Sequence, residues 1–194
     1  MDTPRYRIDW ATEAGRLTAL EPTSAEIATH AAELARGYND PANAALMGHA
    51  DELDADEVVE SYAELIDHGG RAFLVFRDDE LVGDADLRGL HGGDAEFAFM
   101  IGARSAQGKG LGTRVARMVY AFGFQILGLH HIYASLVPHN TGSRRVFEKL
   151  GCRLDDSPTA REFADEPGDI VMAIDRATFE GAHDLAQIRI ATRG

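Results

Sequence analysis

Gln107-Gly-Lys-Gly-Leu-Gly112 places three glycines within six residues, directly ahead of an amphipathic run. Residues 96–101 before it are rich in strand formers, so the order is strand, glycine turn and helix. Glycine lets the backbone approach a ligand closely. The first N–H groups of a helix are unpaired and carry partial positive charge. This order is therefore typical of a phosphate-binding site.

The charge around this turn differs from that of the whole chain. Residues 97–147 hold no Asp or Glu, whereas the chain has a formal net charge of −13. A basic island in an acidic protein predicts an anionic ligand at that place. The alternative is that basic residues cover two helix faces by chance. The basic residues of the island are Arg104, Lys109, Arg114, Arg117, Arg144 and Arg145.

Length and composition favour one soluble domain. The 194 residues are 45% hydrophobic, which allows a substantial core. We expect a single domain over 1–194, with 1–15 a possible N-terminal extension and 176–194 a tail without clear pattern. No apolar run has membrane-spanning length, and the first residues lack a signal-peptide core. These features indicate a cytoplasmic protein, and both a monomer and a homodimer stay open. Because the chain is acidic, we expect no nucleic acid or membrane partner.

Cysteine and histidine usage predicts neither a disulfide nor a metal site. Cys152 is the only cysteine, so no intrachain disulfide can form. His130 and His131 are adjacent, so on a strand they point in opposite directions. We therefore expect no metal, and we expect Cys152 to fill core space rather than act as a nucleophile.

Periodicity and turn signals predict an α/β (α+β) protein with a mixed, mostly antiparallel twisted sheet flanked by about four helices. Short links between 72 and 101 favour antiparallel hairpins. Strands are expected over 16–20, 72–76, 81–87, 96–101, 131–137, 152–154 and 169–174, and residues 6–10 form a strand or an extension. Helices are expected over 24–37 with Ser24 as N-cap, 54–67 with Ile66 inward, 111–127 and 140–150. Residues 43–53 are expected to form a loop or short helix, and 155–168 a polar loop.

These residues resemble the GNAT superfamily of acetyltransferases, whose signature Gln/Arg-x-x-Gly-x-Gly/Ala is matched by Gln107, Gly110 and Gly112. The chain is similar to the branch of ribosomal-protein N-terminal acetyltransferases, RimJ and RimL, over residues 16–175. That branch also covers antibiotics and sugar amines, so the resemblance does not identify the acceptor. The matching pieces are Arg16-Leu17, Asn39-Asp40-Pro41, Glu96, Asn140-x-x-Ser143 and Glu148-Lys149-Leu150-Gly151.

The resemblance implies a GNAT fold and acetyl-CoA as cosubstrate. In the family, the strand before the glycine turn splays from its neighbour, and pantetheine pairs with the exposed strand edge. A backbone N–H there would polarise the thioester carbonyl. The residues expected to bind acetyl-CoA are Phe99, Met100, Ile101, Gln107, Gly108, Lys109, Gly110, Leu111, Gly112, Thr113, Asn140 and Ser143.

The resemblance also implies catalytic residues. Glu96 sits where the branch often has a carboxylate, and an alkylammonium must lose a proton before it attacks, directly to a base or through water. The alternative for Glu96 is a surface or acceptor-binding carboxylate. Asp84 and Asp86 share one strand face, where either could bind the ammonium or serve as base, or could be ordinary polar alternation. Ser143 matches a position near the departing sulfur. Phe147 stands where many members have a proton-donating tyrosine.

We therefore predict an N-acetyltransferase that moves an acetyl group to a primary amine by direct attack in a ternary complex. Residues 38–69 hold nine acidic and no basic residues, a field that attracts a cationic acceptor unless it is only a solvated face. Such acceptors include a peptide N-terminus, a polyamine or an aminoglycoside-like amine. The alternative function is a non-catalytic acyl-CoA-binding GNAT-fold module, which Phe147 favours. A nucleotide-binding protein fits less well, because the Walker spacing is missing.

Overall fold

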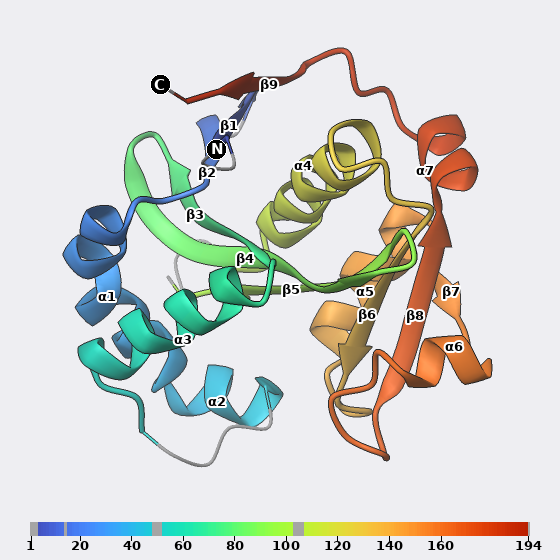
Figure 1. The fold of residues 1–194 in the computed structure, drawn as a ribbon, viewed down its shortest axis with the longest axis horizontal. Helices are drawn as coiled ribbons and strands as arrows, with labels where there is room; N and C mark the ends of the chain where they lie inside the picture. The colour runs from blue at the N-terminus through green and yellow to red at the C-terminus, as the bar shows by residue number, and fades with distance from the viewer. Residues whose placement is uncertain (1–3, 14, 48–51, 103–106, 194) are drawn as a thin grey trace.

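One mixed sheet carries the chain (Figure 1). The computed structural model describes residues 4–13, 15–47, 52–102 and 107–193. Within these ranges the sheet has nine strands in the order β7-β8-β6-β5-β4-β3-β2-β1-β9. The strands are β1 (Tyr6–Thr12), β2 (Gly15–Leu20), β3 (Arg71–Arg77), β4 (Glu80–His91), β5 (Asp94–Ile101), β6 (His131–Leu136), β7 (Arg153–Leu154), β8 (Ile170–Asp175) and β9 (Ile188–Thr192).

Helices cover both faces of this sheet. The described residues form α1 (Ser24–Tyr38), α2 (Pro41–Met47), α3 (Ala55–Asp67), α4 (Leu111–Gln125), α5 (Thr141–Leu150), α6 (Pro158–Arg161) and α7 (Arg176–Ala182). Neighbouring strands pair antiparallel, except for the parallel pair of β5 and β6. The predicted mixed, mostly antiparallel architecture is therefore confirmed. The four longer helices α1, α3, α4 and α5 correspond to the four expected. Of the short ones, α2 overlaps the segment 43–53, where a loop or a short helix is expected, whereas α6 and α7 are additional.

Alternating residues of β3 show how the two layers are built. Phe73 and Val75 belong to the large core under α4, whereas Ala72 and Leu74 pack with α1 and α3. Because side chains alternate across a strand, α4 and the α1–α3 pair must cover opposite faces. The β4–β5 part of the α1–α3 face extends beyond the two helices and carries the polar side chains described below.

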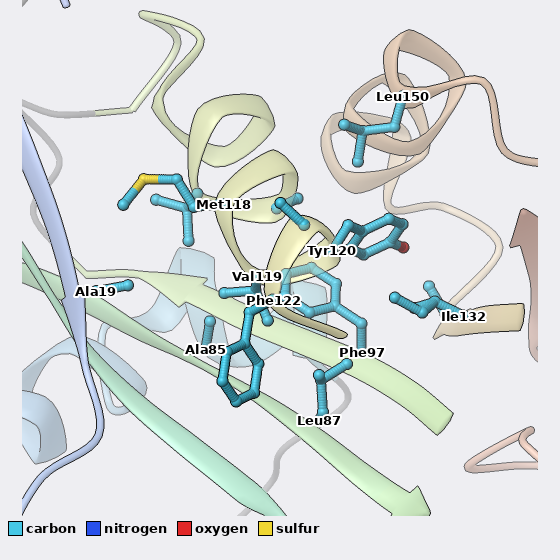
Figure 2. Packing of buried hydrophobic residues seen from close by; sticks show 14 of the residues in the cluster. Ala19, Ala85, Leu87, Phe97, Met118, Val119, Tyr120, Phe122, Ile132 and Leu150 are labelled. Atoms are coloured by element: carbon cyan, nitrogen blue, oxygen red, sulfur yellow. The ribbon is translucent and has the colours of Figure 1, made fainter. Parts of the chain in front are cut away.

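Helix α4 is the centre of the larger core (Figure 2). Its Val119 and Phe122 pack toward Ala85 and Leu87 of the sheet, as Figure 2 shows. Phe122 is fully buried and meets Phe73 edge to face, with ring centroids 5.1 Å apart. Burying such a side chain stabilises the fold by about 1.5–3 kcal/mol. This packing fixes α4, and with it the glycine turn at its N-terminus.

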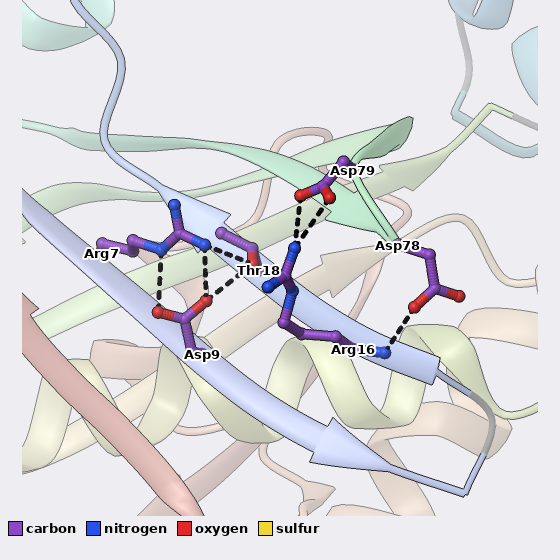
Figure 3. Close-up of polar contacts among 6 residues, drawn as sticks. All are labelled: Arg7, Asp9, Arg16, Thr18, Asp78 and Asp79. Atoms are coloured by element: carbon purple, nitrogen blue, oxygen red, sulfur yellow. Dashed lines mark hydrogen bonds and ion pairs between the residues drawn. The ribbon is translucent and has the colours of Figure 1, made fainter.

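The β3–β4 turn is held against β2 by charged groups (Figure 3). Arg16 donates two side-chain hydrogen bonds to Asp79, at 2.6 and 2.8 Å, and its backbone N–H donates to Asp78 at 2.8 Å. Both aspartates have positive φ, as the turn requires. On the neighbouring strand, Arg7 pairs with Asp9 at 2.8 Å. These exposed pairs add little stability each.

Three local expectations are wrong. The N-cap of α1 is Thr23 rather than Ser24, because Thr23 and Glu26 form a reciprocal capping box. Ile66 does not face inward but is 43% exposed, since α3 ends one residue later and buries Val58 and Tyr62 instead. The segment 155–168 is not only a loop, because Ser157 caps the short helix α6 within it.

The two ends of the chain are also more ordered than expected. Residues 6–12 form β1, which pairs with β2 and β9, so they are not a loose extension. The segment 176–194 contains α7 and β9 rather than a patternless tail. Arg193 holds its end by bonding the Glu21 carbonyl and pairing with Glu26 at 2.6 Å. The single-domain organisation itself stays a prediction.

Candidate functional site

An opening in the sheet begins where β5 leaves β6. Their parallel pairing runs over three residues and ends at Glu96, opposite Tyr133. Strand β5 continues to Ile101 on its other side, paired with β4. Residues 97–101 therefore have no strand partner on the β6 side within the described chain. The expected splay is present, and it leaves backbone groups free to pair with an extended ligand.

The glycine turn lies at the far end of this opening. Gly108 and Gly110 have φ of 72° and 74°, a conformation that side chains other than glycine rarely adopt. Gly110 is the N-cap of α4 and offers no side-chain cap, so the first N–H groups of the helix stay available. A Cβ at Gly112 would lie 2.9 Å from the ring of Phe99. The turn thus packs closely on β5 and presents donors to the opening.

A cavity of about 420 Å³, called here the cofactor cavity, joins the turn to the open edge. All the predicted cofactor-binding residues line it except Lys109, which is exposed and offers its carbonyl to Arg114 at 3.0 Å. Arg104 lies outside the described residues. Arg145 and Lys149 of α5 add positive charge to the lining, as expected for an anion site. Sequence reasoning missed the lining residues Asn43, Leu46 and Met47, which come from α2.

Helix α2 is tied across this cavity by side chains. The Gln107 amide donates to Asn43 at 2.9 Å and to the Ile101 carbonyl at 2.7 Å. The Asn140 amide donates to the Leu46 carbonyl at 2.9 Å. Asn140 also accepts from the Ser143 N–H at 2.9 Å, which confirms it as the N-cap of α5. These tethers occupy the side chains of Gln107 and Asn140 and hold α2 against the cofactor cavity.

A second cavity of about 430 Å³, called here the reaction cavity, continues from the first. The two share Leu46, Met47, Phe99, Met100, Asn140 and Ser143. The far side of the reaction cavity is strongly acidic. Arg88 is the one cation among its described lining residues. Its acidic lining residues are Asp84 and Asp86 on β4 and Asp165, Glu166 and Asp169 on the segment after α6.

Glu96 lies at the point where the two strands part. It is 7% exposed and does not itself line the cavity, although Phe97 and Ala98 beside it do. Burial raises the pKa of Glu96 to about 8, and the charge of Asp165 adds to the rise. A carboxyl with this pKa can accept a proton near neutral pH, and its burial favours a role through an intervening water.

Arg88 stands across the strand pair from Glu96. Its guanidinium donates two hydrogen bonds to Asp86, both 2.6 Å long. Burial lowers the pKa of Arg88, but the bonds to Asp86 and the charges of Glu96 and Asp165 raise it overall. Arg88 and Asp86 therefore neutralise one another, and the remaining lining keeps its negative charge.

Asp84 forms a cluster with two tyrosines from different helices. The hydroxyl of Tyr38 on α1 donates to Asp84 Oδ2 at 2.6 Å, and that of Tyr62 on α3 donates to the same oxygen at 2.7 Å. Burial raises the pKa of Asp84 to about 6, although both tyrosine bonds lower it. Asp84 is 5% exposed and also lines a third cavity of about 410 Å³, which continues under α3.

The leaving thiolate could take a proton from few side chains here, and three positions are relevant: Ser143, Phe147 and Cys152. Ser143 lines both the cofactor and the reaction cavity. Phe147 is 2% exposed and meets Phe97 and Phe99 edge to face, with ring centroids about 6 Å apart. Cys152 is buried, and burial raises its pKa to about 12, so the thiol stays protonated. Among these three side chains, only the Ser143 hydroxyl faces a cavity and carries an exchangeable proton.

The acidic segment 38–69 has a partly structural role. Asp54 and Glu57 form the capping box of α3, so their carboxylates are used by backbone N–H groups. Glu60, Glu64 and Asp67 are exposed on the same helix, whereas Asp51 lies outside the described residues.

Across the described ranges, no three His, Cys, Asp or Glu side chains are grouped to hold a metal. No helix in those ranges is long and apolar enough to cross a membrane.

The sheet thus opens beside a glycine turn, and a cavity with basic lining residues continues into an acidic one. The family model described as the acetyltransferase (GNAT) domain matches residues 16–153. The chain therefore belongs to the GNAT acetyltransferase family.

Two curated relatives match part of the chain. The probable N-acetyltransferase YjcK of Bacillus subtilis (strain 168) is 40% identical over 77 residues, which are 38% of this chain and 42% of that protein. The spermidine N(1)-acetyltransferase of Escherichia coli (strain K12) is 31% identical over 106 residues, 50% of this chain and 56% of that protein. The chain thus spans about half the length of the curated relatives it matches.

Solved structures resemble the whole fold. Mycobacterium smegmatis RimJ in complex with CoA-disulfide has a TM-score of 0.75 and 21% identity, covering 96% of this chain and 97% of that one. Spermidine N-acetyltransferase from Vibrio cholerae in complex with CoA and spermine has a TM-score of 0.67 and 23% identity, covering 84% and 97%. These similarities concern the fold, and they confirm the expected GNAT architecture.

Proposed function

We propose that this protein transfers the acetyl group of acetyl-CoA to a primary amine of a cationic acceptor, by direct attack in a ternary complex. The observation that carries the proposal is the continuity of the cofactor and reaction cavities at Phe99, Met100, Asn140 and Ser143. A thioester reaching along the open edge of β5 would meet an amine arriving from the acidic side at this junction.

The cofactor cavity fits the chemistry of CoA. The unpaired N–H groups at the start of α4 suit a pyrophosphate, and Arg145 and Lys149 add positive charge. The unpartnered edge of residues 97–101 suits the amide groups of pantetheine. Structural neighbours solved with CoA bound support this assignment.

The transfer step needs a base and a polarised carbonyl. The amine nitrogen attacks the thioester carbon, a C–N bond forms, and the C–S bond breaks to release CoA as a thiolate. The proton of the amine passes to Glu96, directly or through a water. A backbone N–H on the open edge of β5 stabilises the oxygen of the tetrahedral intermediate. In this proposal Ser143, which lines both cavities, donates a hydrogen bond to the departing sulfur.

Charge supports a cationic acceptor. Apart from the Asp86–Arg88 pair, the charged lining of the reaction cavity is all acidic in the described residues. The curated and structural neighbours include enzymes named for spermidine, which is a polycation. A cationic amine would therefore be drawn to the cavity, whereas an acidic peptide would be repelled.

The experiment is a panel of amines assayed by release of the CoA thiol. We expect turnover with cationic amines and little with acidic or neutral ones. Calorimetry with acetyl-CoA, run in parallel, separates catalysis from binding. If acetyl-CoA binds and no amine in the panel releases thiol, the protein is an acyl-CoA-binding module, which the apolar Phe147 would then explain.

A further inference from the structure

We infer that Asp84 binds a second, non-reacting ammonium group of the acceptor, so that the protein selects amines carrying two cationic groups. This rests on the proposed function and adds a binding site to it. The site consists of Asp84, held by Tyr38 and Tyr62, at the place where the reaction cavity meets the cavity under α3.

Only one of the two carboxylate oxygens of Asp84 accepts hydrogen bonds in the described residues. Both tyrosine hydroxyls donate to Oδ2, and in the described part of the chain Oδ1 accepts no hydrogen bond and forms no ion pair. The side chain is 5% exposed, yet it lines two cavities. Oδ1 is not enclosed, since Arg117 Nε is the one fully buried side-chain N or O atom without a partner in the described residues. This oxygen is therefore open to a cationic donor that enters the cavity.

A purely structural role explains less of this geometry. Tying two tyrosines to β4 needs an acceptor oxygen, which the side-chain amide of Asn supplies without the cost of burying a charge. Compared with Asn, the carboxylate of Asp84 adds only a negative charge and a second acceptor oxygen. Both features favour a cationic ligand. Arg88 does not supply that cation, because Asp86 already holds it through two hydrogen bonds.

Asp84 lies beside the junction of the two cavities. It pairs across the strands with Met100 of β5, which lines both the cofactor cavity and the reaction cavity. An amine that reacts at this junction would therefore have Asp84 within reach of a second ammonium on the same molecule. The cavity of about 410 Å³ beyond Asp84 leaves room for a group that continues past it.

The test compares α,ω-diamines with monoamines of the same chain length, from three to eight carbons. We expect 1,8-diaminooctane to have at least tenfold higher kcat/KM than octylamine, about 1.4 kcal/mol. In Asp84→Asn the KM for 1,8-diaminooctane should rise about tenfold, while that for octylamine changes less than twofold.

A binding measurement makes the result independent of turnover. Calorimetry with CoA present should show 1,8-diaminooctane binding wild type about tenfold more tightly than octylamine, and Asp84→Asn should remove this difference. Asp67→Asn is the matched control, since it removes the same charge from an exposed position on α3 outside the cavity and should leave the difference intact. Thermal melts verify that both variants fold.

The outcomes separate the two proposals. If no amine is acetylated, the proposed function fails, and binding alone then decides whether Asp84 recognises a second ammonium. If monoamines and diamines are acetylated equally well, or if Asp84→Asn weakens both alike, the second-ammonium site is wrong while the acetyltransferase assignment stands. If Asp84→Asn does not fold, Asp84→Glu replaces it, and unchanged diamine preference after displacing the carboxylate overturns the inference.

Discussion

Glu96 combines burial with a position at the parting of two strands. From the sequence, one would expect the loss in Glu96→Gln to be largest at low pH, where neutral amine is scarce. The raised pKa reverses this expectation, because a carboxyl with a pKa near 8 is mostly protonated at low pH and cannot act as a base there. The ratio of wild-type to Glu96→Gln kcat/KM should therefore rise with pH and level off above about 8. Rates from pH 6 to 10 measure it, and a ratio of one throughout would assign the base to another group.

Glu96→Gln should also change the stability of the folded protein in a pH-dependent way. Because the folded-state pKa of Glu96 lies above its ordinary value of 4.5, the folded protein binds this proton more tightly than the unfolded chain. Its contribution is favourable at low pH and is lost as pH rises toward 8. Glu96→Gln should thus melt higher than wild type at pH 8–9, with a smaller difference at pH 4–5. Equal melting curves at pH 9 would contradict the burial of an ionisable Glu96.

Gly110 tests the cofactor cavity. Its φ of 74° strains any residue with a Cβ, and that Cβ would lie 3.2 Å from the guanidinium of Arg114 at the start of α4. Gly110→Val should weaken acetyl-CoA binding at least tenfold, about 1.4 kcal/mol, by calorimetry. Gly168→Val is the control, because φ there is not positive and an added Cβ meets nothing within 4 Å. Unchanged affinity in a folded Gly110→Val protein would remove the turn from the site.

At the scale of elements, helix α3 carries the acidic field. Reversing Asp54 and Glu57 would break its capping box, so the exposed Glu60 and Glu64 give the cleaner test. Glu60→Lys with Glu64→Lys should raise the KM of a cationic amine severalfold at low salt, and less at 0.15 M or above, where charges are screened beyond about 8 Å. Glu13→Lys with Glu180→Lys carries the same charge change at other exposed positions. If both pairs act alike, the field of α3 has no specific role.

The elements that local patterns predicted well are those with strong periodicity or capping signals. Helix α4 follows a glycine turn, α5 begins at Asn140 and ends at Gly151, and β3 to β5 are joined by short turns. Local patterns do not decide between loop and helix for residues 43–53, because the position of α2 depends on tethers to Gln107 and Asn140, far away in the sequence. No local rule predicts such tertiary contacts.

The candidate site shows the same division. The glycine turn and Asn140-x-x-Ser143 are each contiguous in the sequence, so a local motif predicts them. The Asp84 cluster is not contiguous, since Tyr38 and Tyr62 are 46 and 22 residues away from Asp84, and the sequence indicates only two aspartates on one strand face. Likewise, the pKa of Glu96 depends on Asp165, which a separate segment brings to the cavity. Burial and distant charges are tertiary properties that spacing does not encode.

At the scale of the whole molecule, the two chain ends meet in one sheet edge (Figure 1). A hydrogen bond from Arg193 lowers the pKa of Glu26 to about 2, so the pair stabilises the fold above about pH 4.5 and loses its effect as pH falls toward 2. Arg193→Ala should lower the melting temperature by a few degrees at pH 7, and by less at pH 3. Arg189→Ala on the same strand is the control. Equal effects of the two variants at pH 7 would mean that β9 is not held by this pair.

The account as a whole claims that acetyl passes straight from acetyl-CoA to an amine at the junction of the two cavities. The most direct measurement is the initial rate of thiol release with acetyl-CoA and a cationic diamine both varied. Direct transfer predicts intersecting double-reciprocal lines and no acetylated protein when the amine is omitted. Parallel lines together with an acetylated protein intermediate, or no amine-dependent thiol release at all, would contradict it.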